Sequence, residues 1–192
     1  MQYLVSVSAL ALLLAGGLTF AGETPAEIRF AQAATPAASP TATAELKTAD
    51  GKDAGKVTLT QTQSGVRLQL ALTGLPPGEH AFHVHAVGKC EPPFTSAGPH
   101  FNPQQKKHGK ENPEGHHAGD MDNLTVPANG MVSLTVVNND ITLEKGKSNS
   151  VFQEAATAIV VHAGKDDYKS DPAGNAGDRI ACGIITEARA AH

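Results

Sequence analysis

Short runs of alternating apolar and polar residues dominate the chain from residue 45 onwards. Residues 57–60 and 66–72 alternate most clearly, and the turn-forming residues 63–65 separate them. Because successive side chains of a β-strand point to opposite faces, a period of two predicts strands. Further strand-like runs lie at 82–85, 123–126, 131–137, 158–162 and 179–186. With no helical periodicity of any length, the pattern predicts an all-β antiparallel sandwich or barrel.

The N-terminal segment differs in composition from the rest of the chain. Residues 1–21 contain an apolar run at 10–14 that is too short to span a bilayer comfortably, which is typical of a secretory signal peptide. Small residues offer cleavage sites at 19–21 and, as late as residue 33, at 31–33. No Lys or Arg precedes the apolar run, so an uncleaved membrane anchor is the competing interpretation.

Residues 22–44 are expected to form a disordered, low-complexity tether. Their last part, 34–44, is uncharged and rich in Ala, Pro and Thr, so it cannot bury enough apolar surface to offset the entropy of ordering. The total length of 192 residues then leaves a single domain at 45–192. The net charge of −4 is mild and argues against nucleic acid as a partner.

Histidines are concentrated in one part of the chain. His83 and His85 alternate with apolar residues and would share one face of a strand. Three imidazoles and one carboxylate follow in a Gly/Pro-rich loop, a mixture that suits tetrahedral Zn²⁺. These loop residues are His100, His108, His117 and Asp120. The surplus of imidazoles fits copper, so composition suggests two metals that share a histidine.

Four motifs resemble the copper/zinc superoxide dismutase family in their order and in the gaps between them. They are Phe82-His83-Val84-His85, Ser96-Ala97-Gly98-Pro99-His100-Phe101-Asn102-Pro103, His117-Ala118-Gly119-Asp120 and Gly174-Asn175-Ala176-Gly177-Asp178-Arg179-Ile180-Ala181-Cys182-Gly183. The resemblance covers about residues 45–187. It implies an eight-stranded antiparallel Greek-key β-barrel (an immunoglobulin-like sandwich) with long metal-binding loops. It also implies an oxidoreductase that converts superoxide into oxygen and hydrogen peroxide, with one copper and one zinc per chain.

The resemblance also implies a ligand set. Copper would be held by His83, His85, His100 and His162, and zinc by His100, His108, His117 and Asp120. His100 would then bridge the two metals, serve as a proton donor, and count among the catalytic residues. The gaps of eight residues from His100 to His108, nine to His117 and three to Asp120 match the family's spacing. That spacing favours His117 over the neighbouring His116, which is expected to be a loop histidine.

Two further residues take roles from the same resemblance. Asp166 would accept hydrogen bonds from a copper histidine and a zinc histidine, the kind of partner that metal-binding histidines need to fix their orientation. Arg179 would stand at the mouth of the copper channel and attract the anionic substrate. The segment between Asp166 and Arg179 is shorter than in animal and plant members, so other charges must be considered. The lysines at 106, 107 and 110 either supply a positive field or form a solvated basic loop.

The remaining motifs concern the cysteines, one histidine and a possible modification site. Cys90 and Cys182 form an even pair behind a signal peptide, which favours a disulfide over two free thiols. His80 matches no ligand position and is interpreted as structural. Asn123-Leu124-Thr125 matches a glycosylation acceptor, a pattern that is common by chance.

The sequence therefore predicts a secreted enzyme, located in the periplasm or outside the cell. Its expected partner is superoxide, with no stable membrane insertion after signal cleavage, and it would be a homodimer or a monomer. A non-catalytic copper/zinc-binding or copper-delivery protein of the same fold is the alternative. A purely adhesive sandwich is a third hypothesis, but it leaves the histidine spacing unexplained.

Overall fold

The computed structural model describes residues 39–188, so the expected signal peptide lies outside the described residues. Its one helical element is a short 3₁₀ turn, η1 (Thr95–Ala97). The strands are β1 (Thr41–Thr48), β2 (Asp53–Thr62), β3 (Gly65–Leu72), β4 (Gly78–His80), β5 (Phe82–His85), β6 (Leu124–Val126), β7 (Val132–Asn138), β8 (Ala158–His162), β9 (Arg179–Ile184) and β10 (Thr186–Glu187). Within residues 39–188, no helix is long and apolar enough to cross a bilayer.

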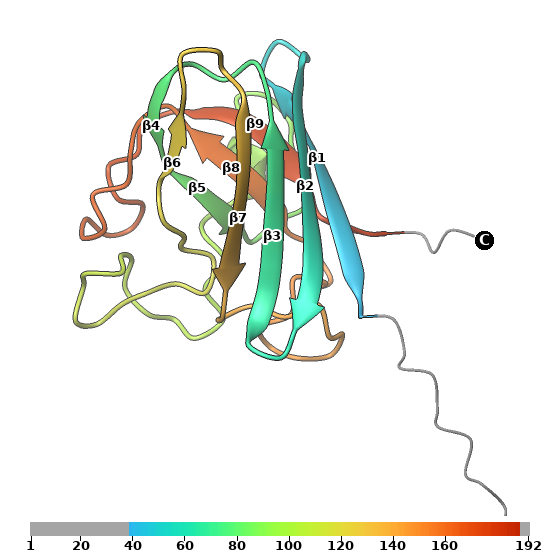
Figure 1. Ribbon diagram of the computed structural model, residues 1–192. Helices are drawn as coiled ribbons and strands as arrows, with labels where there is room; N and C mark the ends of the chain where they lie inside the picture. Colours follow the sequence, from blue (N-terminus) through green and yellow to red (C-terminus); the bar gives the residue numbers. More distant parts are fainter. Residues whose placement is uncertain (1–38, 189–192) are drawn as a thin grey trace, which may run out of the picture. The chain divides into compact units, whose positions relative to one another are not determined.

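All strand pairings are antiparallel, and the strands curl into a barrel (Figure 1). The main sheet has the order β5-β8-β9-β1-β2-β3-β7, β10 pairs with β1, and β4 pairs with β6. β4 continues into β5 after Ala81, and β9 continues into β10 after Ile185, so the ten strands follow eight paths. Neighbours such as β3–β7 and β1–β9 are far apart in sequence, as in a Greek key. The expected eight-stranded antiparallel barrel is confirmed.

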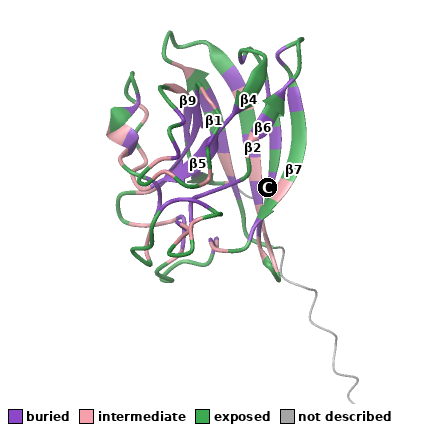
Figure 2. Cartoon of the chain, turned by 90° about the vertical axis from the view of Figure 1, so that its left-hand side faces the viewer, coloured by how far each residue is buried: buried purple, intermediate pink, exposed green. Residues whose placement is uncertain are grey.

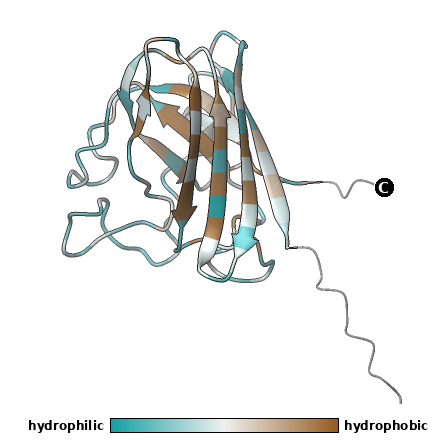
Figure 3. Ribbon diagram, viewed as in Figure 1, coloured by the Kyte–Doolittle hydropathy of each residue, from teal (hydrophilic) through white to brown (hydrophobic). Residues whose placement is uncertain are grey.

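The core follows directly from the alternation in the sequence. In β3, residues Val66, Leu68, Leu70 and Leu72 are buried, while the residues between them face outward. Figure 3 shows the resulting alternation of apolar and polar positions along the front strands, and Figure 2 shows the buried positions lining the interior. Burying one such side chain contributes roughly 1.5–3 kcal/mol, so the barrel is a rigid support for whatever its strands carry.

The ordered domain begins earlier than the sequence suggested. β1 starts at Thr41, inside the segment 22–44 that was expected to be a tether. Ala42 and Ala44 are fully buried and pair with β2 in register with Leu59 and Val57. The prediction of a boundary at residue 45 was therefore wrong, because alternating Ala and Thr give little hydrophobic contrast.

Two long connections carry the candidate site. The first, residues 86–123, joins β5 to β6, and the second, residues 163–178, joins β8 to β9. In Figure 1 both lie on the same side of the barrel, next to β4 and β6. The expected disulfide between Cys90 and Cys182 is present, with a Cα–Cα distance of 5.6 Å, and it fastens the first connection to β9.

Candidate metal centre

Two groups of potential metal ligands lie side by side at the barrel wall. In each group the ligand atoms all lie within 4.8 Å of one another. The first group, called here the four-histidine group, is His83, His85, His100 and His162; the second, the three-histidine–aspartate group, is His100, His108, His117 and Asp120. All seven side chains are at most 6% exposed, and His100 belongs to both groups.

The barrel strands position the four-histidine group. β5 carries His83 and His85 on one face, and the neighbouring β8 ends at His162. Each of these histidines directs one ring nitrogen outward to an acceptor. His83 Nε2 lies 2.9 Å from Asp166 Oδ2, His85 Nδ1 lies 2.9 Å from the Gly98 carbonyl, and His162 Nδ1 lies 3.3 Å from the Gly177 carbonyl. With the outer nitrogen donating, the inner nitrogen of each ring keeps its lone pair for the centre of the group.

The three-histidine–aspartate group converges on one carboxylate oxygen. Asp120 Oδ1 lies 2.9 Å from His100 Nδ1, 3.1 Å from His108 Nδ1 and 3.3 Å from His117 Nδ1. The other oxygen, Oδ2, accepts the backbone N–H groups of Gly109 and His117, each at 3.0 Å. The loop backbone thus fixes the carboxylate with Oδ1 directed toward the three imidazoles.

His100 and Asp166 connect the two groups in different ways. His100 directs Nδ1 toward Asp120, and its Nε2 lies on the other side of the ring, toward the four-histidine group. Asp166 is 2% exposed; it accepts from His83 Nε2 at 2.9 Å and from His108 Nε2 at 3.0 Å. One carboxylate therefore sets the ring orientation of a histidine in each group.

Burial controls the charge of most of these histidines in the metal-free chain. It lowers the pKa of His83 and His85, and it lowers the pKa of His100 to about 4 and of His162 to about 3. His108 is the exception. Burial lowers its pKa, but hydrogen bonds to Asp120 and Asp166 outweigh this and raise it to about 9.

The two carboxylates stay ionised. Burial raises their pKa, but hydrogen bonds from His100 and His108 hold the pKa of Asp120 well below its ordinary value. Those from His108 and His83 do the same for Asp166. The site thus combines fixed negative charge with four histidines whose lowered pKa keeps them neutral, the protonation states that metal ligands require, and a metal at His108 must first displace its proton.

Arg179, at the start of β9, is held by the disulfide-bonded loop. Its Nη1 donates to the Phe94 carbonyl at 2.6 Å and its Nη2 to the Gly98 carbonyl at 2.8 Å. The Gly98 carbonyl also accepts from His85 Nδ1, so a single backbone oxygen joins the arginine to the four-histidine group. The guanidinium is partly exposed beside these histidines, where a small anion could reach it.

His116 and His80 lie outside both ligand groups. His116 lies 3.0 Å from Asp140, partly exposed. His80 is buried, with Nδ1 2.8 Å from the His162 carbonyl and Nε2 2.9 Å from the Pro76 carbonyl.

The basic loop provides less free charge than its sequence suggests. Lys110 Nζ lies 2.9 Å from Asp122, and Lys107 Nζ lies 3.6 Å from Asp171. These pairs place a negative charge beside two of the three lysines, which supports the solvated-loop interpretation over a steering field.

The polar atoms left without partners test whether metals fit. Among residues 39–188, three buried ring nitrogens have no hydrogen-bond partner: His83 Nδ1, His100 Nε2 and His117 Nδ1, the last of which lies 3.3 Å from Asp120 Oδ1 without forming a hydrogen bond. An unpartnered buried polar atom is costly, and all three are directed into the two groups. Cations at the two centres would satisfy them, and imidazole nitrogens suit both copper and zinc. Fold and site together define a β-barrel metalloprotein with two adjoining metal sites.

Comparison with known proteins gives the family. Residues 53–185 match the family model described as copper/zinc superoxide dismutase. The chain is 56% identical over 144 residues to superoxide dismutase [Cu-Zn] 1 of Aquifex aeolicus, covering 74% of this chain and 85% of that one. It is 43% identical over 147 residues to superoxide dismutase [Cu-Zn] of Caulobacter vibrioides, covering 75% and 84%. A crystal structure of a SOD-like protein from Bacillus subtilis superposes with a TM-score of 0.72 at 37% identity, covering 74% and 96%.

The chain belongs to the copper/zinc superoxide dismutase family. It is an oxidoreductase that converts superoxide into oxygen and hydrogen peroxide, with copper and zinc as cofactors. The alternative of a non-catalytic metal-binding protein is not favoured. The bacterial relatives and the disulfide are consistent with a location outside the cytoplasm.

Apart from Asp166, the sequence did not identify the partners that orient these residues. The carbonyls of Gly98 and Gly177 orient His85 and His162, yet a backbone oxygen leaves no trace in residue identity. The Asp171 carboxylate, which accepts the His108 backbone N–H at 2.7 Å, also went unnoticed. The sequence signal for this contact was the presence of an acidic residue, Asp171, in the short connection before Arg179.

Proposed function

We propose that the four-histidine group holds copper, that the three-histidine–aspartate group holds zinc, and that His100 bridges them. The observation that carries this assignment is that the two ring nitrogens of His100 face different groups. Nδ1 shares the Asp120 oxygen with His108 and His117, whereas Nε2 is buried without a hydrogen-bond partner beside the other group. Copper, when bound, supplies a one-electron couple that takes an electron from one superoxide and gives it to the next.

The protein's own residues prepare the site for this reaction. Asp166 holds the rings of His83 and His108, and the barrel strands hold His85 and His162, so the imidazoles need no rearrangement between turnovers. His100 Nε2 would take up a proton from solvent in one half-reaction and donate it to the peroxide formed in the other, whose second proton would come from solvent.

Arg179 binds and orients the substrate anion in this proposal. Its two bonds to the Phe94 and Gly98 carbonyls fix the guanidinium next to the four-histidine group. A fixed cation at a partly exposed position raises the local concentration of a small anion and the rate of productive encounter.

The cellular location extends the same proposal. We propose that residues 1–21 are a signal peptide, which is cleaved at 21 or as late as 33. The residues from the cleavage site to the start of β1 would form a tether. The mature enzyme would act in the periplasm or outside the cell as a monomer or homodimer, without stable membrane insertion. N-terminal sequencing of the secreted protein tests the cleavage, and uncleaved membrane-bound protein would contradict it.

Metal content measured together with superoxide-dependent activity tests the assignment. The expected result is one copper and one zinc per chain in the loaded protein, with activity abolished in His162→Ala and retained in the control His116→Ala. Both metals bound without any activity would contradict the catalytic proposal. An active His162→Ala variant would contradict the ligand assignment.

A further inference from the structure

Asn123 holds the backbone of Asp166 through both ends of its side-chain amide. Its Nδ2 donates to the Asp166 carbonyl at 2.9 Å, and its Oδ1 accepts the Asp166 backbone N–H at 2.8 Å. These two residues are 43 positions apart and belong to the two different loops of the site. The amide therefore acts as a clamp between the loops, at the residue whose carboxylate orients His83 and His108.

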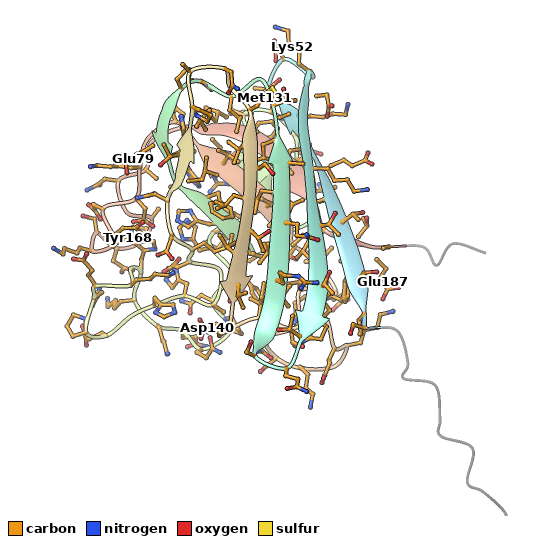
Figure 4. All side chains as sticks on the ribbon, viewed as in Figure 1. Lys52, Glu79, Met131, Asp140, Tyr168 and Glu187 are labelled. Carbon is orange, nitrogen blue, oxygen red and sulfur yellow. A yellow bond between two sulfur atoms is a disulfide. The ribbon has the colours of Figure 1, made fainter. Side chains whose placement is uncertain are left out.

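The barrel fixes the position of this clamp. Asn123 is followed directly by β6, where Leu124 is 1% exposed and pairs with His80 of β4. The backbone N–H of Asn123 donates to the Tyr168 hydroxyl at 2.7 Å, and Tyr168 in turn donates its own N–H to Asp166 Oδ1 at 2.7 Å. Figure 4 shows Tyr168 on the loop side of the molecule. Three bonds thus tie Asn123 to the segment that bears Asp166.

We propose that Asn123 is a positioning residue for the two-metal centre and acts through Asp166. The clamp prevents the Asp166 backbone from moving, so its two carboxylate oxygens stay 2.9 and 3.0 Å from the ring nitrogens of a histidine in each group. Partners that orient metal-bound histidines typically affect metal affinity by about 10–100-fold. This inference rests on the proposed function, and it adds a residue to which the family resemblance gave no role.

The same geometry bears on the glycosylation pattern at Asn123-Leu124-Thr125. A glycan would be attached to Nδ2, the atom that donates to the Asp166 carbonyl. Attachment would replace one of the two Nδ2 hydrogens with a bulky group next to the Asp166 backbone and so oppose the clamp. In the folded enzyme Asn123 is a structural link to the metal centre rather than a modification site.

Zinc affinity, measured by competition with a chromophoric chelator, tests the inference in the full-length protein. Asn123→Asp keeps the shape of the side chain but places an oxygen against the Asp166 carbonyl. We expect its zinc affinity to fall by about tenfold or more. Asn149→Asp is the matched control, because Asn149 is also half-buried and donates through Nδ2 to a backbone carbonyl, that of Asp140, at 2.8 Å. We expect this control to stay within about twofold of the unmodified protein, since it does not touch Asp166.

A double-mutant cycle separates positioning from general destabilisation. In an Asp166→Asn background, Asn123→Asp should reduce zinc affinity by less than about twofold further, because its effect passes through Asp166. An equal loss in both backgrounds, or no loss in either, would overturn the inference. If near-ultraviolet circular dichroism shows Asn123→Asp to be unfolded, Asn123→Ala is measured in the same cycle with the same criteria. An unmodified protein that binds no zinc would instead overturn the proposed function on which the inference rests.

Discussion

At the scale of single residues, the hydrogen bond donated by the outer nitrogen of an imidazole fixes the tautomer of the ring. The inner nitrogen then has a free lone pair that can bind a metal. His83, His85 and His162 each donate outward, to a carboxylate or a carbonyl, and so present a lone pair inward. The outward partners are fixed by the backbone or by Asp166, which means that the geometry of the centre is set before any metal arrives.

Arg179 offers the most direct residue-scale prediction. Arg179→Ala should lower kcat/KM by about tenfold or more, because a fixed cation beside the site draws in the anionic substrate. Its residual rate should also depend less on ionic strength than that of the unmodified enzyme. Stopped-flow measurements of superoxide decay test both effects, with Arg67→Ala on the exposed face of β3 as the control. An unchanged kcat/KM would remove Arg179 from the mechanism.

The protonation of the histidines predicts how the metal-free protein responds to acid. The pKa of His162 is lowered to about 3 and that of His100 to about 4, so below about pH 6.5 the unfolded chain binds protons that the folded chain does not. Stability should therefore fall as the pH drops from about 6.5 to 4, by up to about 1.4 kcal/mol per pH unit for each histidine.

His108 acts in the opposite direction. Its pKa is raised to about 9, so the stability it contributes is complete below about pH 6.5 and is lost as the pH rises through 9. The free energy of unfolding of the metal-free protein should thus be greatest near pH 6.5. Urea unfolding followed by circular dichroism at about pH 4.5, 6.5 and 9 tests this. A stability that rises steadily toward pH 4.5 would contradict the assigned directions.

At the scale of elements, the disulfide joins β9 to the loop that holds Arg179. Its partners are 92 residues apart, and closing a loop of this size contributes about 4–5 kcal/mol in the chain-entropy model. Cys90→Ser/Cys182→Ser should lose stability on that scale. Because the loop also supplies the Gly98 carbonyl to His85 and Arg179, activity should fall even where the variant remains folded. Full activity in a folded double variant would show that the loop holds its position without the bond.

At Gly119 the metal-bearing loop packs closely against β5. A Cβ at this position would collide with the Val84 carbonyl of β5 and lie 3.1 Å from the Phe101 nitrogen. Gly119→Ala should push the loop away from β5 and displace the adjacent Asp120, which lowers zinc content. Zinc analysis after purification measures the effect. Gly146→Ala is the control for a glycine substitution outside the metal-bearing loop: a Cβ there meets nothing within 4 Å, and its positive φ of 78° strains only its own turn. Full zinc occupancy in Gly119→Ala would contradict this contact.

How much the sequence predicts differs between elements. β2 and β3 alternate between the barrel interior and solvent, so their period of two was visible, whereas β1 relies on the small residues Ala42 and Ala44 and was assigned to the tether. The side chains of both ligand groups could be named from motif spacing. The Gly98 carbonyl and the Asn123 clamp could not be named in this way. The first depends on how a loop packs against β5, and the second on how two loops meet in space.

At the scale of the whole molecule, the barrel and the metal centre form one cooperative structure. β5 and β8 lie in the core of the barrel and also carry His83, His85 and His162. Metals that bind the folded chain more tightly than the unfolded chain stabilise it by mass action. Loading with zinc and copper should therefore raise Tm, and removal by a chelator should lower it. Calorimetry of loaded and metal-free protein measures the difference, and equal Tm values would contradict the coupling.

The central claim is that His100 connects two metals through its two ring nitrogens. The most direct test is electron paramagnetic resonance of protein with Cu²⁺ in the four-histidine group and Co²⁺ in place of zinc. A bridging imidazolate couples the two paramagnetic ions, so the Cu²⁺ signal should disappear when Co²⁺ is added and remain when Zn²⁺ is added instead. A Cu²⁺ signal that persists unchanged beside bound Co²⁺ would contradict the bridge.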